Sequence, residues 1–178
     1  GADEWLMTLP VPERGCGPTW CPAYLVLFET TGGLFRPWYV VRGTPPEEVQ
    51  IQQPELRLIQ DINADGETEV VIEQRWCGAH TCFTGLTVGR WDGSRWHDLV
   101  ADSISQAYTD LSIEDRDGDG VIEFVMHGGT FGSVGAGLQR QHTLIFDWED
   151  GAYRLVEDIP DPSVHAYYLM LDANTALA

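Results

Sequence analysis

The sequence contains no lysine, and all ten of its basic residues are arginine, against 28 acidic residues. Without lysine, the chain lacks the residue for Schiff-base chemistry, for the phosphate-binding loop of nucleotide hydrolases and for lysine–asparagine cross-links. The formal net charge of -18 argues against nucleic acid and anionic membranes as partners, because phosphate binding requires a basic surface. We therefore expect no nucleic-acid partner.

Long apolar runs are also missing, and none approaches the roughly 20 residues that a membrane-spanning helix needs. We therefore expect no insertion into a membrane. The chain begins at Gly1 without a basic or apolar leader, so we expect a mature form from which any signal peptide has been removed. Neither Asn63 nor Asn174 lies in an N-glycosylation sequon.

Signatures of catalysis are missing as well. The sequence has no G-x-S-x-G motif, because Phe131 stands where that motif would need a glycine before Ser133. The glycine-rich residues 135–137 do not continue into a dinucleotide-binding fingerprint. The sequence therefore predicts that the protein is not an enzyme, and we assign no catalytic residues.

Two acidic segments, residues 61–69 and 115–123, share the pattern D-x-[DN]-x-D-G-x-x-E. Oxygen-bearing side chains alternate along each segment, and a glycine at the sixth position permits the positive φ of a tight turn. Calcium takes about six to eight oxygen ligands, so the pattern predicts two Ca²⁺ sites, with acidic turns that hold no metal as the alternative. The predicted ligands are the side chains of Asp61, Asn63, Asp65, Glu69, Asp115, Asp117, Asp119 and Glu123, and the backbone carbonyls of Glu67 and Val121.

The first half of this pattern also occurs in EF-hands, whose twelfth position carries a glutamate. The twelfth position here is Ile72 in the first segment and Met126 in the second, which excludes an EF-hand. Residues 70–72 and 124–126, which follow the segments, are β-branched, aromatic or apolar, as is typical of strands. We therefore expect each acidic segment to form the tip of a β-hairpin.

An acidic loop of this pattern between two strands resembles the calcium loops of FG-GAP and VCBS repeats, which occur in integrin α-subunit propellers and in bacterial surface proteins. Asn63 replaces the usual aspartate in the first loop. The likeness is specific around the two loops and fades elsewhere. It implies propeller-like β-sheet blades and a calcium-stabilised extracellular role in binding or structure, without catalysis.

Four cysteines form two C-G-x-x-x-C segments, one with Cys16 and Cys21 and the other with Cys77 and Cys82. An even number of cysteines in an acidic, exported chain indicates disulfides, and the repeated spacing favours pairing within each segment. The two cross-pairings stay open. A zinc site at Cys77, His80 and Cys82 is a further alternative, although the first segment contains no histidine.

Aromatic hairpins also repeat along the chain. One follows each acidic segment, at residues 91–96 and 148–153, and an earlier hairpin follows the first cysteine segment. We expect the aromatic residues of the two later hairpins to pack between sheets rather than to bind a ligand. These residues are Trp91, Trp96, Trp148 and Tyr153.

Together these patterns predict an all-β fold in a single domain, residues 1–178, built from about three propeller-like antiparallel repeats with calcium-binding hairpin loops. Closed propellers typically have about four to eight blades, so we do not expect one chain to close a ring. A short helical turn is expected at residues 44–47, where the sequence could form a capping box. The predicted repeat units are residues 5–53, 54–101 and 102–160, followed by a C-terminal strand within residues 161–178.

The predicted function is that of a secreted or cell-surface module stabilised by calcium, with a structural or binding role. An open β array presents unpaired backbone groups at its ends, which favours association through β edges with itself or with another extracellular protein. Self-association of this kind would produce a head-to-tail filament. The alternative is a calcium-dependent glycan-binding or adhesion domain of a larger surface protein.

Overall fold

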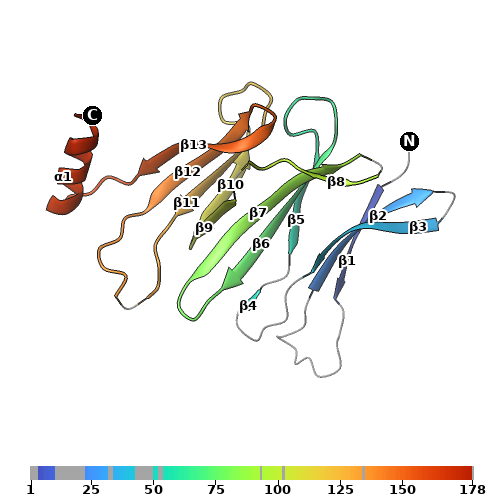
Figure 1. The fold of residues 1–178 in the computed structure, drawn as a ribbon, viewed down its shortest axis with the longest axis horizontal. Helices are drawn as coiled ribbons and strands as arrows, with labels where there is room; N and C mark the ends of the chain where they lie inside the picture. Colours follow the sequence, from blue (N-terminus) through green and yellow to red (C-terminus); the bar gives the residue numbers. More distant parts are fainter. Residues whose placement is uncertain are drawn as a thin grey trace.

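The computed structural model describes residues 4–10, 23–31, 34–42, 50–51, 54–92, 94–101, 103–133 and 135–177. These residues form thirteen strands and one helix, and all the strand pairs within the sheets are antiparallel (Figure 1). The prediction of a mostly β, antiparallel fold is confirmed. None of the described sheets closes on itself.

Three sheets follow one another along the chain, each built from neighbouring strands. The first contains β1 (Glu4–Pro10), β2 (Ala23–Thr31) and β3 (Leu34–Arg42). The middle sheet has β6 (Glu69–Cys77) and β7 (Cys82–Trp91) at its centre, with β4 (Gln50–Ile51) and β5 (Glu55–Gln60) on β6, and β8 (Trp96–Asp98) and β9 (Ile104–Ala107) on β7. The third contains β10 (Asp110–Glu114), β11 (Glu123–Gly128), β12 (His142–Glu149) and β13 (Ala152–Pro160).

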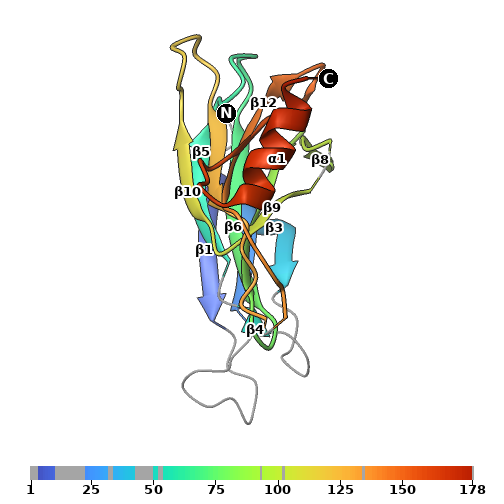
Figure 2. The ribbon, with the colours of Figure 1, turned by 90° about the vertical axis from the view of Figure 1, so that its left-hand side faces the viewer.

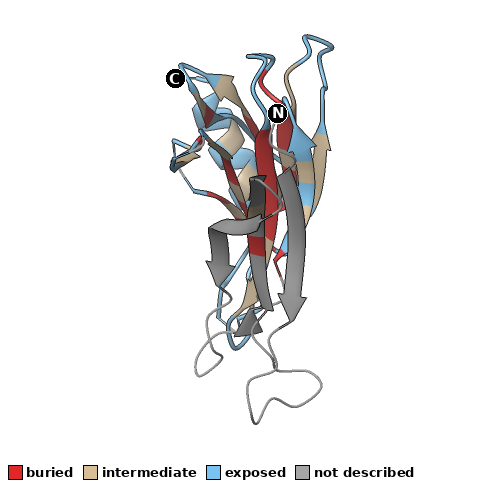
Figure 3. Cartoon of the chain, turned by 90° about the vertical axis from the view of Figure 1, so that its right-hand side faces the viewer, coloured by how far each residue is buried: buried red, intermediate tan, exposed pale blue. Residues whose placement is uncertain are grey.

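The middle and third sheets share one hydrophobic core, and the buried segments lie along their central strands (Figure 3). Strands β6 and β7 supply apolar side chains from one side, and β11, β12 and β13 supply them from the other. Burying apolar surface in this way is the main favourable contribution to folding. The buried cluster consists of Ile62, Val71, Leu86, Val88, Leu99, Ile104, Phe124, Met126, Phe146 and Tyr153.

Tyr153 joins the third sheet to the middle one. Its amide donates to the carbonyl of Leu99 at 2.7 Å, and its own carbonyl accepts from the amide of Ala101 at 3.1 Å. Its ring is 0% exposed and lies 4.7 Å from Phe124 and 5.2 Å from Trp148, measured between ring centroids. The prediction that Trp148 and Tyr153 pack between sheets is therefore confirmed.

Trp96 and Trp91 lie opposite each other in the β7–β8 hairpin, and both are partly buried. The Trp96 ring occupies the space beside Gly89 of β7, where a Cβ would come within 2.5 Å of the ring. Glycine at this position therefore makes room for the tryptophan.

The C-terminal segment corrects one prediction, because residues 161–178 contain a helix and not a strand. Helix α1 spans Ala166–Thr175, and His165 caps its first turn by accepting a hydrogen bond from the amide of Tyr167. Apolar residues on both faces of this segment are typical of a covered strand. However, alanine, leucine and methionine favour a helix, and the first β-branched residue is Thr175 at its end.

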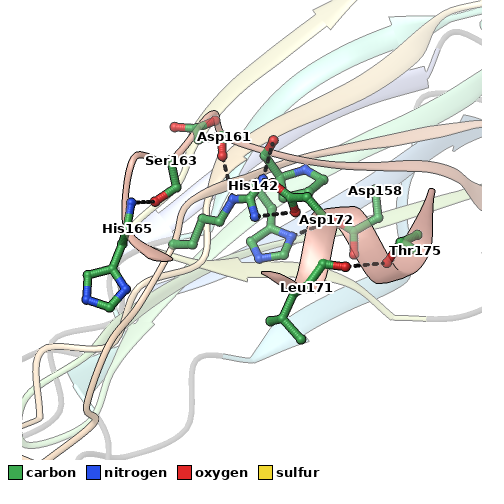
Figure 4. A network of polar contacts seen from close by, with 10 residues as sticks. His142, Asp158, Asp161, Ser163, His165, Leu171, Asp172 and Thr175 are labelled. Atoms are coloured by element: carbon green, nitrogen blue, oxygen red, sulfur yellow. Dashed lines mark hydrogen bonds and ion pairs between the residues drawn. The ribbon is translucent and has the colours of Figure 1, made fainter. Parts of the chain in front are cut away.

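An arginine just before β12 holds helix α1 beside the third sheet (Figure 2). Nη1 and Nη2 of Arg140 lie 2.8 and 3.2 Å from the two carboxylate oxygens of Asp172, and the guanidinium lies 5.4 Å from the ring centroid of Tyr168. Close by, Nδ1 of His142 lies 2.6 Å from Oδ1 of Asp158 (Figure 4). The helix has no buried residue, and the contacts of Arg140 with Asp172 and Tyr168 attach it to the segment before β12.

Cys77 and Cys82 form a disulfide between the two strands of the β6–β7 hairpin, at the residue pair nearest to its turn, with their Cα atoms 3.9 Å apart. This pairing agrees with the prediction and excludes a zinc site at Cys77, His80 and Cys82, because oxidised cysteines provide no thiolate ligands. The predicted Cys16–Cys21 pair and the predicted helical turn at 44–47 lie outside the described residues. Among the residues described, no helix is long and apolar enough to cross a membrane.

Candidate metal sites

The two acidic segments occupy equivalent places in the middle and third sheets. Residues 61–68 connect β5 to β6, and residues 115–122 connect β10 to β11. Both strand pairs are antiparallel, so both segments are hairpin tips, as predicted. We call them the first loop and the second loop. Both lie at the same end of the molecule, opposite the tip of the β6–β7 hairpin (Figure 1).

The backbones of the two loops bend at the same positions. The fourth residue has a positive φ in both, 58° at Ala64 and 82° at Gly118, and so does the sixth, 85° at Gly66 and 93° at Gly120. Positive φ is costly for residues with a side chain, and three of these four positions are glycine. The shared backbone conformation shows that the sequence repeat is also a structural repeat.

Four hydrogen bonds recur at the same positions of both loops. Loop positions are counted from one to nine. The backbone amide at position six donates to the side chain at position one, and the amide at position five donates to the side chain at position three. The amide at position seven donates to the side chain at position five, and the amide at position two donates to the glutamate at position nine. In the first loop the pairs are Gly66–Asp61, Asp65–Asn63, Glu67–Asp65 and Ile62–Glu69, at 2.8 to 3.1 Å. In the second loop they are Gly120–Asp115, Asp119–Asp117, Val121–Asp119 and Arg116–Glu123, at 2.6 to 3.1 Å.

The glutamate that closes each loop is buried. Glu69 is 0% exposed and Glu123 is 4% exposed. Each uses Oε2 to accept the amide of the second loop residue, and Oε1 of Glu69 has no hydrogen-bond partner. A buried carboxylate oxygen without a partner carries a desolvation cost that a bound cation would offset.

Burial raises the pKa of both glutamates above its usual value, because desolvation disfavours the charged form. The neighbouring carboxylates of Asp65 and Asp61 raise the pKa of Glu69 further. At Glu123, the carboxylate of Asp147 on β12 adds to the same effect. These repulsions would all be reduced by a cation between the carboxylates.

The predicted carboxylate ligands come together as expected from the spacing. In each loop the oxygens of the carboxylates lie within 4.8 Å of one another, and the two clusters could each hold a metal ion. Asn63 lies in the same loop and donates through Nδ2 to Oδ2 of Asp65 at 3.2 Å. The amides of Glu67 and Val121 support the loops, while coordination by their carbonyls stays a prediction. The clusters are Asp61, Asp65 and Glu69 in the first loop, and Asp115, Asp117, Asp119 and Glu123 in the second.

The two clusters differ in charge. Arg90 of β7 forms an ion pair with Asp65 of the first loop, with Nη1 and Oδ2 2.9 Å apart. In the part of the chain that the structure describes, the carboxylates of the second loop form no ion pair with a basic side chain. The cluster of the second loop also contains one carboxylate more, because Asp117 stands at the position that Asn63 occupies in the first loop. It is therefore the more negative of the two sites.

Sequence reasoning missed three residues that shape the sites. Arg90 comes from another strand, and Tyr153 reaches the first loop from β13 through a hydrogen bond between its hydroxyl and the carbonyl of Ile62, at 3.0 Å. Ile62 stands at an unspecified position of the motif, yet its side chain is 0% exposed. The alternation of apolar and acidic residues in the first loop was the one available signal for its burial.

The fold and the loops define a mostly β protein with two acidic clusters that could hold metal ions. No protein family, curated protein or solved structure matches the chain in comparisons of sequence and structure. The relation to FG-GAP and VCBS repeats therefore stays a resemblance carried by the two loops.

Proposed function

We propose that the protein is a non-enzymatic, calcium-stabilised structural or binding module of the cell surface or the extracellular space. The observation that supports this most is the recurrence of one loop conformation, with the same four internal hydrogen bonds and a buried glutamate, in two different sheets. Burying a carboxylate at the same position of both loops carries a desolvation cost, which a bound cation would offset. The disulfide is consistent with an oxidising compartment.

Calcium fits the chemistry of the ligands better than other common metals. Every predicted ligand atom is an oxygen, which suits hard cations and disfavours zinc and copper. Magnesium requires near-ideal octahedral geometry and retains water, whereas calcium accepts irregular sets of carboxylate, amide and carbonyl oxygens. A loop that combines carboxylates with the amide of Asn63 and a backbone carbonyl is of the calcium type.

The role of the ions would be to hold the hairpins together. Each loop concentrates carboxylates at the end of a strand pair, where they repel one another in the absence of a cation. A bound ion would turn this repulsion into attraction and fix β5 against β6 and β10 against β11. Both loops lie beside the core that the middle and third sheets share, so the ions would also stabilise the contact between these sheets.

Isothermal titration of the calcium-depleted protein tests this proposal, and we expect two bound ions per chain. The second loop should fill first, because its cluster has four carboxylates against three and none of them is paired with an arginine. Glu69→Gln and Glu123→Gln should each weaken binding most strongly at their own loop, whereas Glu157→Gln, an exposed control on β13, should leave binding at both loops unchanged. Wild-type protein that takes up no calcium would refute the proposal.

Self-association through a β edge is the second part of the proposed function. Strand β13 is the edge of the third sheet: residues 99–101 bond to it at Tyr153, and beyond that bridge its partner among the described strands is β12. Its side chains Leu155, Val156 and Ile159 are 36 to 46% exposed, and an exposed apolar edge strand can pair with another chain. We propose a second copy of the protein as the partner, in a head-to-tail contact that continues into a filament.

Light scattering coupled to size-exclusion chromatography, over a range of protein concentrations with and without calcium, tests the association. We expect oligomers that grow with concentration in calcium, because bound ions reduce the repulsion between chains of net charge -18. Val156→Lys should reduce the association, since a charge on an edge strand opposes pairing. A monomer under every condition would remove this part of the proposal.

A further inference from the structure

Ile62 connects the two loops to each other. Its amide donates to Oε2 of Glu69 at 3.0 Å, within the first loop. Its carbonyl accepts the amide of Ile122 of the second loop at 2.8 Å, and also accepts the hydroxyl of Tyr153 at 3.0 Å. The side chain of Ile62 is fully buried in the shared core, so this residue has little freedom to move independently of either loop.

The contact between Ile62 and Ile122 links the buried glutamates of the two loops. Glu69 closes the first loop and holds the Ile62 peptide directly. Ile122 is the residue immediately before Glu123, which closes the second loop. A continuous path of two hydrogen bonds and one peptide link thus runs from Glu69 through Ile62 and Ile122 to Glu123.

We propose that the two metal sites bind calcium cooperatively and that Ile62 carries the coupling through its backbone amide and carbonyl. This inference rests on the proposed calcium binding. An ion in the second loop fixes Glu123 and the preceding Ile122, whose amide holds the carbonyl of Ile62. The amide of Ile62 then holds the carboxylate of Glu69, so that Glu69 is already ordered when the ion of the first loop binds. A site that is ordered in advance loses less conformational entropy on binding, which strengthens its affinity.

The coupling must act equally in both directions, because each ion changes the affinity for the other by the same factor. Direct repulsion between two divalent ions opposes it. This repulsion is screened at physiological salt, where the Debye length is about 8 Å, whereas hydrogen bonds in a buried contact are not. Measurement at physiological ionic strength therefore reduces the opposing repulsion.

The coupling can be measured with variants that retain one site each. The double variant Asp61→Asn, Asp65→Asn retains only the metal site of the second loop. The double variant Asp115→Asn, Asp119→Asn retains only the metal site of the first loop. For independent sites, the overall association constant for two ions in the wild-type protein equals the product of the two single-site constants. We expect the wild-type value to exceed this product by at least about 5-fold, the lower end of typical allosteric coupling.

Tyr153→Phe tests whether the coupling passes through Ile62, since it removes one of the two hydrogen bonds to the Ile62 carbonyl and retains the ring in the core. The coupling factor is the overall association constant for two ions divided by the product of the two single-site constants. We expect Tyr153→Phe to bind both ions and its coupling factor to be lower than that of the wild-type protein. Tyr108→Phe is the matched control, because its hydroxyl bonds the carbonyl of His80 at the disulfide hairpin, away from the loops. This control should retain the wild-type coupling.

The outcomes separate the two proposals. Two ions bound with a coupling factor of one would overturn the cooperativity and leave the calcium proposal intact. A coupling factor that is the same in Tyr153→Phe and in wild-type protein would overturn the assignment to Ile62. Absence of any calcium binding in wild-type protein would overturn both.

Discussion

Removal of calcium is expected to lower the free energy of unfolding by about 5 kcal/mol. A ligand that binds only the folded state stabilises it by about 2.7 kcal/mol at a free concentration 100 times Kd, and the protein has two such sites in our account. Folded proteins of this size are typically stable by about 5–15 kcal/mol, so loss of both ions would remove a large share. The physical cause is the buried, mutually repelling carboxylates of the loops, above all Glu69 and Glu123.

Urea denaturation with excess calcium and with EDTA measures this loss. The double variant Glu69→Gln, Glu123→Gln is the control, because the neutral amides remove much of the repulsion and of the affinity for calcium. Its stability should respond much less to EDTA than that of the wild-type protein. Unfolding curves of wild-type protein that coincide with and without EDTA would contradict the predicted role of the ions.

Tyr153→Ala is expected to destabilise the protein by about 3–5 kcal/mol, as is typical when a large buried aromatic side chain is truncated. Its ring packs against Phe124 and Trp148 in the core shared by two sheets. Its hydroxyl also bonds the carbonyl of Ile62, and burial raises the pKa of this hydroxyl, so it remains a protonated donor at physiological pH. The truncation would therefore leave both a cavity and a weakened contact with the first loop.

Urea denaturation at a fixed calcium concentration compares this variant with two others. Tyr153→Phe should lose only about 1 kcal/mol, because the ring stays and the carbonyl of Ile62 still accepts the amide of Ile122. Tyr167→Ala on helix α1 should change stability by less than about 0.5 kcal/mol, since that side chain is exposed. If Tyr153→Ala were as stable as the wild-type protein, the described packing of the third sheet on the middle sheet would be wrong.

The loops could be predicted from the sequence because their structure is decided locally. Nine consecutive residues contain the carboxylates, the glycine that permits the turn and the glutamate that closes it. The four hydrogen bonds that recur in both loops also stay within each loop, as between Gly66 and Asp61. The flanking strands were predictable for the same reason, since β-branched and aromatic residues on both sides favour extended backbone.

The contacts between loops and sheets could not be predicted, because they join residues far apart in the chain. Tyr153 and Ile62 are separated by 91 positions, and Arg90 meets Asp65 only once β7 lies beside β6. Nothing in a local pattern specifies such a pairing. The same limit explains helix α1, whose apolar residues suggested a covered strand although the helix buries none of them.

An experimental electron-density map of the protein in millimolar calcium tests the central claim most directly. Our account predicts one ion in each loop, at about 2.3–2.6 Å from the carboxylate oxygens of Asp61, Asp65 and Glu69 and of Asp115, Asp117, Asp119 and Glu123. Oε1 of Glu69, which is buried without a hydrogen-bond partner, should face the first ion. Loops without density for an ion, with their aspartates turned into solvent, would contradict the account.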